Sequence, residues 1–168
     1  MALIIEDGSN VANANSVATV VELRAYAALR GDTVPTADGD CEVILIQGMD
    51  YINSIEDKLQ GYRYYYADGQ SLCLPRGDIK EFGRYVGGEI IQRMKDAQCQ
   101  LAVDASSNDL LAAGNGRELI EKKVGPLTSK WNPSGSTAPQ YSPTAALAIL
   151  EPLFKAGVGS SINLLAYR

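Results

Sequence analysis

The longest regular pattern of apolar and polar positions in the chain spans residues 79–101. At about 100° per residue, its apolar side chains fall in one arc roughly 80° wide, outside which the charged side chains lie. The apolar members are Ile79, Val86, Ile90, Met94, Ala97 and Leu101. The pattern predicts one long amphipathic helix at the centre of the core. Gly83 and Gly87 lie on or beside the arc, where each costs about 1 kcal/mol relative to alanine. They indicate either a second backbone packed close by or a slight kink.

A shorter helix is expected over residues 20–30. Thr19 and Glu22 have the spacing of a capping box, in which the threonine hydroxyl accepts from the amide of Glu22 and the carboxylate accepts from the amide of Thr19. Gly31 can then adopt the left-handed conformation that ends many helices.

A third helix is expected over residues 41–59, where the apolar residues share a face of roughly 120°. We expect the core to be the antiparallel pair of residues 41–59 and 79–101, covered by residues 20–30. Glu56 and Asp57 lie on the polar side of this helix, so we interpret them as part of a solvated face rather than as a catalytic carboxylate pair.

The C-terminal part of the chain begins with a predicted β-hairpin over residues 118–131, broken at Gly125 and Pro126. A final short helix is expected over residues 144–154, and Pro152 would kink it or end it.

Both ends of the chain carry short apolar runs, residues 2–5 and 162–167. Each is too short to be stable as a lone strand, so we expect a partner strand within the chain or, preferably, on a neighbouring subunit; the alternative is that both ends are frayed. The predicted fold is mainly α, a small helical bundle with a β-hairpin and short terminal strands. It forms a single domain over residues 1–168, with extended arms at 1–9 and 160–168.

The chain is acidic, with a net charge of −5 and a pI near 4.7. This balance argues against a protein that binds nucleic acid by neutralising phosphates, because that mode needs clustered lysine and arginine. The chain has three cysteines, Cys41, Cys73 and Cys99, and no two of them form a C-x-x-C pair. Because their number is odd and this motif is absent, we interpret them as buried thiols in a reducing compartment. Neither a signal peptide nor a membrane span is evident, and we expect a soluble protein made in a cytoplasm.

The most aromatic stretch is residues 61–76, which contains Tyr62, Tyr64, Tyr65 and Tyr66. Such residues can stack nucleobases, but tyrosine is also favoured at protein interfaces. Since the chain is acidic, we interpret this linker as a packing or interface element.

The sequence offers little catalytic chemistry. It contains no histidine, which removes the usual triads, imidazole acid–base catalysis and the commonest metal ligand. No phosphate-binding loop, dinucleotide motif or calcium loop can be recognised. We therefore expect no enzyme, no cofactor and no metal site; a small hydrolase would lack the residues to carry its reaction.

A series of short motifs occurs in order along nearly the whole chain. They are Leu3-Ile4-Ile5-Glu6-Asp7-Gly8, Ala14-Asn15-Ser16, Ala25-Tyr26, Arg30-Gly31, Gly48-Met49-Asp50-Tyr51-Ile52, Leu72-Cys73-Leu74-Pro75-Arg76 and Lys122-Lys123-Val124-Gly125-Pro126, with Trp131 and Tyr141. In these motifs the chain resembles the head-tail connector, or adaptor, proteins of long-tailed bacteriophages. Many of these carry the label of DnaT-like single-stranded DNA-binding proteins.

The resemblance implies a structural virion protein of the neck. Its copies would form a ring, expected to be dodecameric, between the portal protein and a tail or neck protein. Genomic DNA would pass through the lumen without sequence-specific binding, and no membrane is involved. An acidic chain suits a passage that does not retain DNA.

We expect the terminal arms, the tyrosine-rich linker and the hairpin to contact other subunits or partners. The predicted interface residues are Leu3, Ile4, Ile5, Tyr64, Tyr65, Tyr66, Lys122, Val124, Trp131, Ile162, Leu164 and Leu165. The alternative function is that of a single-stranded DNA-binding replication accessory. Ring particles would favour the connector, whereas tight, salt-dependent binding of an oligonucleotide would favour the accessory.

Overall fold

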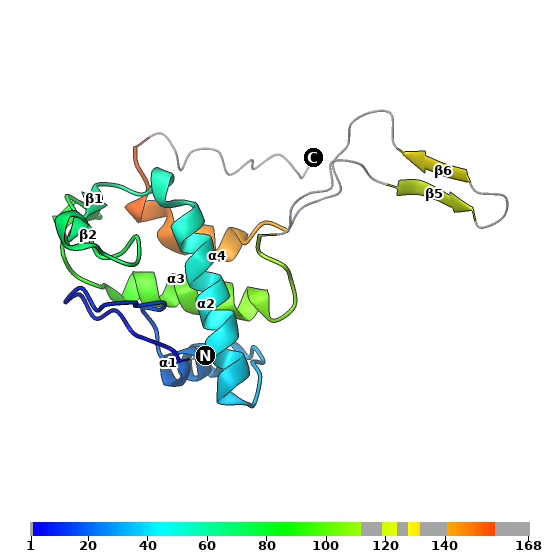
Figure 1. Ribbon diagram of the computed structural model, residues 1–168, viewed down its shortest axis with the longest axis horizontal. Helices are drawn as coiled ribbons and strands as arrows, with labels where there is room; N and C mark the ends of the chain where they lie inside the picture. The colour runs from blue at the N-terminus through cyan, green and yellow to red at the C-terminus, as the bar shows by residue number, and fades with distance from the viewer. Residues whose placement is uncertain (1, 112–118, 124–127, 132–140, 157–168) are drawn as a thin grey trace.

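The structure is a computed structural model that describes residues 2–111, 119–123, 128–131 and 141–156 (Figure 1). In this part, helices α1 to α4 are accompanied by three two-stranded antiparallel sheets. The prediction of a mainly helical fold is therefore confirmed for the described residues. None of the helices described is both long enough and apolar enough to cross a membrane.

Helix α1 (Val20–Arg30) has the predicted bounds and the predicted caps. The amide of Glu22 donates to Thr19 Oγ1 at 3.2 Å, and the amide of Thr19 donates to Glu22 Oε2 at 2.7 Å. Gly31 ends the helix with φ of 74°, a left-handed conformation that costs glycine little. The buried face of α1 joins α2 and α3 in a cluster that includes Leu23.

Helix α2 (Asp38–Ser54) begins before the predicted start at residue 41 and ends before the predicted end at residue 59. The 3₁₀ helix η1 (Glu56–Lys58) follows it. Helix α3 (Gln92–Ala105) packs on α2 more extensively than any other pair of described helices does. Gly48 lies where the two helices pack tightly, because a Cβ atom there would be 3.0 Å from the carbonyl oxygen of Gln98. The expected packing of α2 against α3 is present, but the two helices cross steeply (Figure 1), so the prediction that they run antiparallel is wrong.

The prediction of one helix over residues 79–101 is wrong in its first half. Residues 79–91 instead contain a small hairpin of β3 (Lys80–Glu81) and β4 (Arg84–Tyr85), and α3 begins only at Gln92. Gly83 has φ of 83° and lies in the hairpin turn, so neither it nor Gly87 lies on a helix face.

The apolar positions of that expected helix are nevertheless mostly buried. Ile79 is fully buried and Val86 is 5% exposed, and both belong to the main core cluster together with Met94 and Leu101. The amide of Val86 donates to the carbonyl of Ile79 at 3.1 Å. A hairpin thus places the same two side chains in the core that a helix would have placed there, which is why their spacing misled the prediction.

The linker between α2 and this hairpin is held by a buried arginine. Strand β1 (Tyr62–Arg63) pairs with β2 (Arg76–Gly77). Arg76 is 3% exposed and donates to Glu56 and to the carbonyls of Gln60, Gly61 and Cys73. Glu56 also accepts from Arg63 at 2.7 and 2.9 Å. Glu56 is therefore the anion of a structural charge cluster, not part of a solvated face.

The N-terminal segment packs on its own chain. Ile5 forms a parallel bridge with Ser16, and the amide of Ile4 donates to Asn15 Oδ1 at 2.8 Å. Glu6 is 1% exposed and accepts backbone amides from residues 8, 10 and 11, which fixes the loop that follows. Within the described structure, this apolar run therefore has a partner on its own chain, and its expected contact with a neighbouring subunit stays a prediction.

The C-terminal elements include the predicted hairpin and the predicted last helix. Strands β5 (Leu119–Lys123) and β6 (Thr128–Trp131) are antiparallel and stand apart from the helical body (Figure 1). Helix α4 (Thr144–Leu150) packs on α3 and passes into the 3₁₀ helix η3 (Glu151–Leu153), where Pro152 lies. Phe154 then bridges to Leu59. The second apolar terminus, residues 162–167, lies outside the described residues.

Candidate interaction surface

Exposed aromatic side chains gather on the linker and the β3–β4 hairpin. We call this set the aromatic surface: Tyr62, Tyr64, Tyr66, Phe82 and Tyr85, which are between 49% and 81% exposed. Three of the rings lie against glycine backbone: Tyr62 on Gly77, Tyr64 on Gly88 and Tyr85 on Gly87. Backbone contacts therefore hold these three rings in place, while all five aromatic side chains remain exposed.

The charges around the aromatic surface are balanced. Arg63 and Arg76 are both paired with Glu56. Lys80 and Arg84 are exposed and form no ion pair with the described residues. The exposed acids of the same stretch are Asp68, Asp78 and Glu89. A surface that binds a nucleic-acid backbone concentrates cations, so the aromatic content favours stacking whereas the charge does not.

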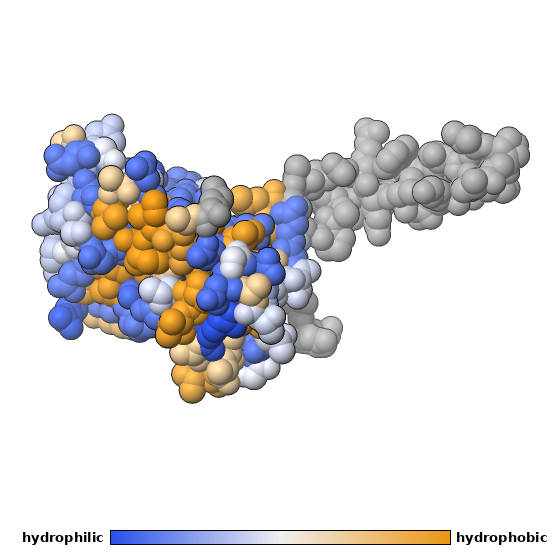
Figure 2. All heavy atoms as spheres, turned by 60° about the horizontal axis from the view of Figure 1, so that its bottom comes forward, coloured by the Kyte–Doolittle hydropathy of each residue, from blue (hydrophilic) through white to orange (hydrophobic). Residues whose placement is uncertain are grey.

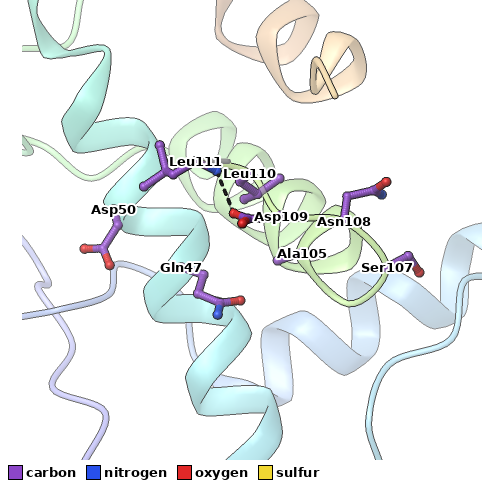
Figure 3. Close-up of a pocket in the computed structure, with 8 residues that line it drawn as sticks. All are labelled: Gln47, Asp50, Ala105, Ser107, Asn108, Asp109, Leu110 and Leu111. Atoms are coloured by element: carbon purple, nitrogen blue, oxygen red, sulfur yellow. Dashed lines mark hydrogen bonds between the residues drawn. The ribbon is translucent and has the colours of Figure 1, made fainter. Parts of the chain in front are cut away.

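A second feature is a pocket at the C-terminal end of α3, with a volume of about 530 Å³. Figure 3 shows Gln47 and Asp50 of α2 on one side and the chain after α3 on the other. We call it the α3-end pocket; it is lined by Gln47, Asp50, Ala105, Ser107, Asn108, Asp109, Leu110 and Leu111. Its lining combines two carboxylates with apolar side chains.

The two carboxylates of the α3-end pocket differ in their surroundings. Asp109 Oδ1 accepts from the amide of Leu111 at 3.1 Å. Partial burial raises the pKa of Asp50 above its ordinary value, because a low-polarity environment disfavours the charged form. A cation placed in the pocket would offset this effect.

The outer face of α1 is also apolar. Val21 is 76% and Leu29 85% exposed, and Ala25 and Ala28 are exposed between them. Figure 2 shows apolar residues gathered in a broad area on one face of the body, viewed with the side that carries α1 brought forward. Exposed apolar area of this kind is typical of proteins that associate with others.

The predicted interface residues fall into three groups. Leu3, Ile4 and Ile5 are half-buried; Leu3 and Ile4 pack on the core, and Ile5 forms the bridge with Ser16. Tyr64 and Tyr66 are exposed, whereas Tyr65 is half-buried and donates to the carbonyl of Gly8 at 3.0 Å.

The hairpin and the C-terminus make up the third group. Lys122 pairs with Ser129, and Trp131 pairs with Leu119. Val124, Ile162, Leu164 and Leu165 lie outside the described residues.

Sequence reasoning missed Phe82, Tyr85 and the α3-end pocket. The first two lie inside the stretch that we had expected to be helical, where their exposure on a hairpin was not visible. The dipeptide Phe82-Gly83 followed by Gly87-Gly88 is a turn signal that could have revealed the hairpin. The pocket joins residues far apart in the chain and has no local signal.

The three thiols are buried and free, as predicted. Burial raises the pKa of Cys73 and of Cys99 to about 12, so both stay protonated and unreactive near neutral pH. Among the described residues, no cluster of three or more histidine, cysteine or carboxylate side chains is placed to hold a metal ion.

The complete chain, residues 1–168, matches a protein family described as "Putative DnaT-like ssDNA binding protein". The chain belongs to this family. No curated protein and no solved structure matches it. The family description names single-stranded DNA binding and does not mention a phage connector.

Proposed function

We propose that the protein is a structural subunit of a bacteriophage neck, which assembles into a ring between the portal and a tail or neck protein and lets genomic DNA pass through its lumen. The ring is proposed to be dodecameric. No catalytic activity is part of this proposal. The motifs that resemble head-tail connectors supply its biological setting.

The β5–β6 hairpin is the observation that carries the proposal. Its two strands pair with each other and make their main contacts with each other. An isolated two-stranded hairpin is at best marginally stable in water, so a hairpin that stands apart from the body (Figure 1) gains stability by packing on another subunit. The exposed apolar face of α1 and the aromatic surface offer further area for such contacts.

The charge of the chain supports a passage for DNA rather than a site that binds DNA tightly. With a net charge of −5, the protein would repel the phosphate backbone at long range. A lumen with this property would let DNA move without holding it.

The second candidate is a single-stranded DNA-binding accessory protein. The family description favours this candidate over the first, and the aromatic surface supports it because tyrosine and phenylalanine rings stack on bases at roughly 1–3 kcal/mol each. The balanced charge around those rings weighs against it.

Two measurements on the full chain separate the candidates. Mass photometry and negative-stain images, with and without portal protein, should reveal ring particles if the first candidate is right. Fluorescence anisotropy with a labelled oligonucleotide should reveal binding that weakens steeply with salt if the second is right. A protein that stays monomeric in both conditions and binds the oligonucleotide tightly would overturn the connector proposal.

A further inference from the structure

Phe82 occupies an unfavourable place in the β3–β4 hairpin. Residues 82 and 83 form the two-residue turn between Glu81 and Arg84, with φ of 48° for Phe82 and 83° for Gly83. A turn with positive φ at both central positions normally takes asparagine, aspartate or glycine first. A bulky residue with positive φ is a conformational outlier. The backbone alone would therefore not select phenylalanine at this position.

Packing within the chain gives little in return for this strain. The Phe82 side chain is 79% exposed. Its ring makes a cation–π contact with the guanidinium of Arg93, whose carbon lies 5.0 Å from the ring centroid. A strained residue that presents an exposed aromatic ring is typical of a binding anchor. Two exposed cations lie on either side of Phe82. Lys80 is the first residue of β3, and Arg84 is the first residue of β4, directly after the turn.

The α3-end pocket has the complementary properties. Leu111 supplies exposed apolar lining and the buried Leu110 lies beside it, whereas Asp50 and Asp109 contribute carboxylates from α2 and from the chain after α3, the Asp50 carboxylate pointing away from Asp109 (Figure 3). Its volume of about 530 Å³ exceeds the roughly 150 Å³ in which a benzene ring can be held. It can therefore receive an aromatic side chain flanked by cations.

We propose that Phe82 of one copy inserts into the α3-end pocket of a second copy, with Lys80 and Arg84 facing Asp50 and Asp109. The inference rests on the proposed function, since it names the contact through which copies would associate. The proposal commits to a second copy because Lys80 and Arg84 on one surface are opposite in charge to Asp50 and Asp109 on the other; binding of nucleic acid by the hairpin is an outcome of the test below.

The two surfaces cannot meet within one chain. The hairpin contacts Arg93 in the first turn of α3, whereas the pocket begins at Ala105, where α3 ends. About 20 Å of helix separates these points at 1.5 Å per residue. A contact between opposite ends of a molecule is head-to-tail, and repetition of such a contact generates closed rings or open filaments.

The sharpest test is Phe82→Asn. Asparagine suits the turn, so the variant should melt at a higher temperature than the wild type as an isolated chain, while its association should weaken by about 30-fold or more in Kd, as for the loss of a central aromatic anchor. Tyr66→Asn, at an aromatic of similar exposure outside the proposed contact, is the matched control and should associate normally. Phe82→Asn chains that assemble as the wild type does would overturn the inference.

Charge reversal tests the pairing of the two surfaces. Chains with Lys80→Glu and Arg84→Glu should fail to assemble alone, and so should chains with Asp50→Lys and Asp109→Lys. Mixing the two variants should restore assembly, because each reversed hairpin then meets a reversed pocket and each unchanged hairpin an unchanged pocket. Failure of the mixture to assemble, with both variants folded by circular dichroism, would contradict the pairing.

The outcomes also separate this inference from the proposed function. Wild-type rings that tolerate all these substitutions would remove the contact and leave the ring function standing. A wild-type chain that remains monomeric with and without portal would overturn both. Oligonucleotide binding that Phe82→Asn abolishes, with assembly unchanged, would assign Phe82 to nucleic acid instead.

Discussion

Gly48 of α2 faces Leu101 of α3 so closely that a Cβ atom at position 48 would lie 3.2 Å from the Cβ of Leu101 and 3.0 Å from the carbonyl oxygen of Gln98. Backbone atoms of a packed helix cannot easily move away. Gly48→Ala should therefore destabilise the fold by about 1–3 kcal/mol, the usual cost of overpacking a core. Chemical denaturation monitored by circular dichroism measures this change.

Gly39 provides the matched control in the same helix. Nothing lies within 4 Å of a Cβ atom built there, so Gly39→Ala should stabilise the chain by about 0.4–1 kcal/mol by restricting the unfolded state. Equal effects of the two substitutions would contradict the close approach of α2 and α3.

The charge cluster around Glu56 predicts a pH dependence of stability. The hydrogen bonds from Arg63, opposed by partial burial and aided by the charges of Arg63 and Arg76, hold the pKa of Glu56 below its ordinary value of 4.5. A lowered pKa in the folded state contributes stability above the ordinary pKa, and this contribution is lost as pH falls toward the folded-state pKa. Glu56→Gln should thus destabilise the chain at neutral pH, and its difference from the wild type should shrink in acid.

Urea denaturation of both chains at pH values from about 7 to about 3 would follow this difference. Asp57→Asn is the control, since Asp57 is the exposed neighbour of Glu56 and forms no ion pair with the described residues. A difference between wild type and Glu56→Gln that stays constant over the whole range would contradict the cluster.

The buried thiols predict slow chemical modification. Cys73 and Cys99 are at most 2% exposed, and burial raises the pKa of each to about 12. Because the thiolate is the reactive species, a thiol reagent at mildly alkaline pH should react far more slowly with the native chain than with the chain in guanidinium. Rapid native labelling of both residues, located by mass spectrometry, would show that the core opens readily.

The C-terminal apolar run predicts an assembly defect. Deletion of residues 162–168 should leave a folded chain that fails to join the particle, since these residues include Ile162, Leu164 and Leu165, which we expect at an interface. Circular dichroism would establish folding, and mass photometry would measure incorporation. Truncated chains that enter particles as often as full-length chains would remove these residues from the interface.

Local signals determined some elements from the sequence alone. Helix α1 was predicted with its bounds because Thr19, Glu22 and Gly31 lie within one turn of its ends and cap it directly. The burial of the cysteines and of most apolar positions between Ile79 and Leu101 was also predicted, because transfer from water depends mainly on the chemistry of each side chain.

Tertiary structure decided the remainder. Ile79 and Val86 are buried from a hairpin as readily as from a helix, so their spacing could not distinguish the two. Glu56 became the partner of Arg63 and Arg76 only because β1 and β2 bring both arginines back to the end of α2. Leu110 and Asp50 line one pocket although they are far apart in the chain. Contacts between distant residues depend on the path of the whole chain, and no local pattern of residues encodes that path.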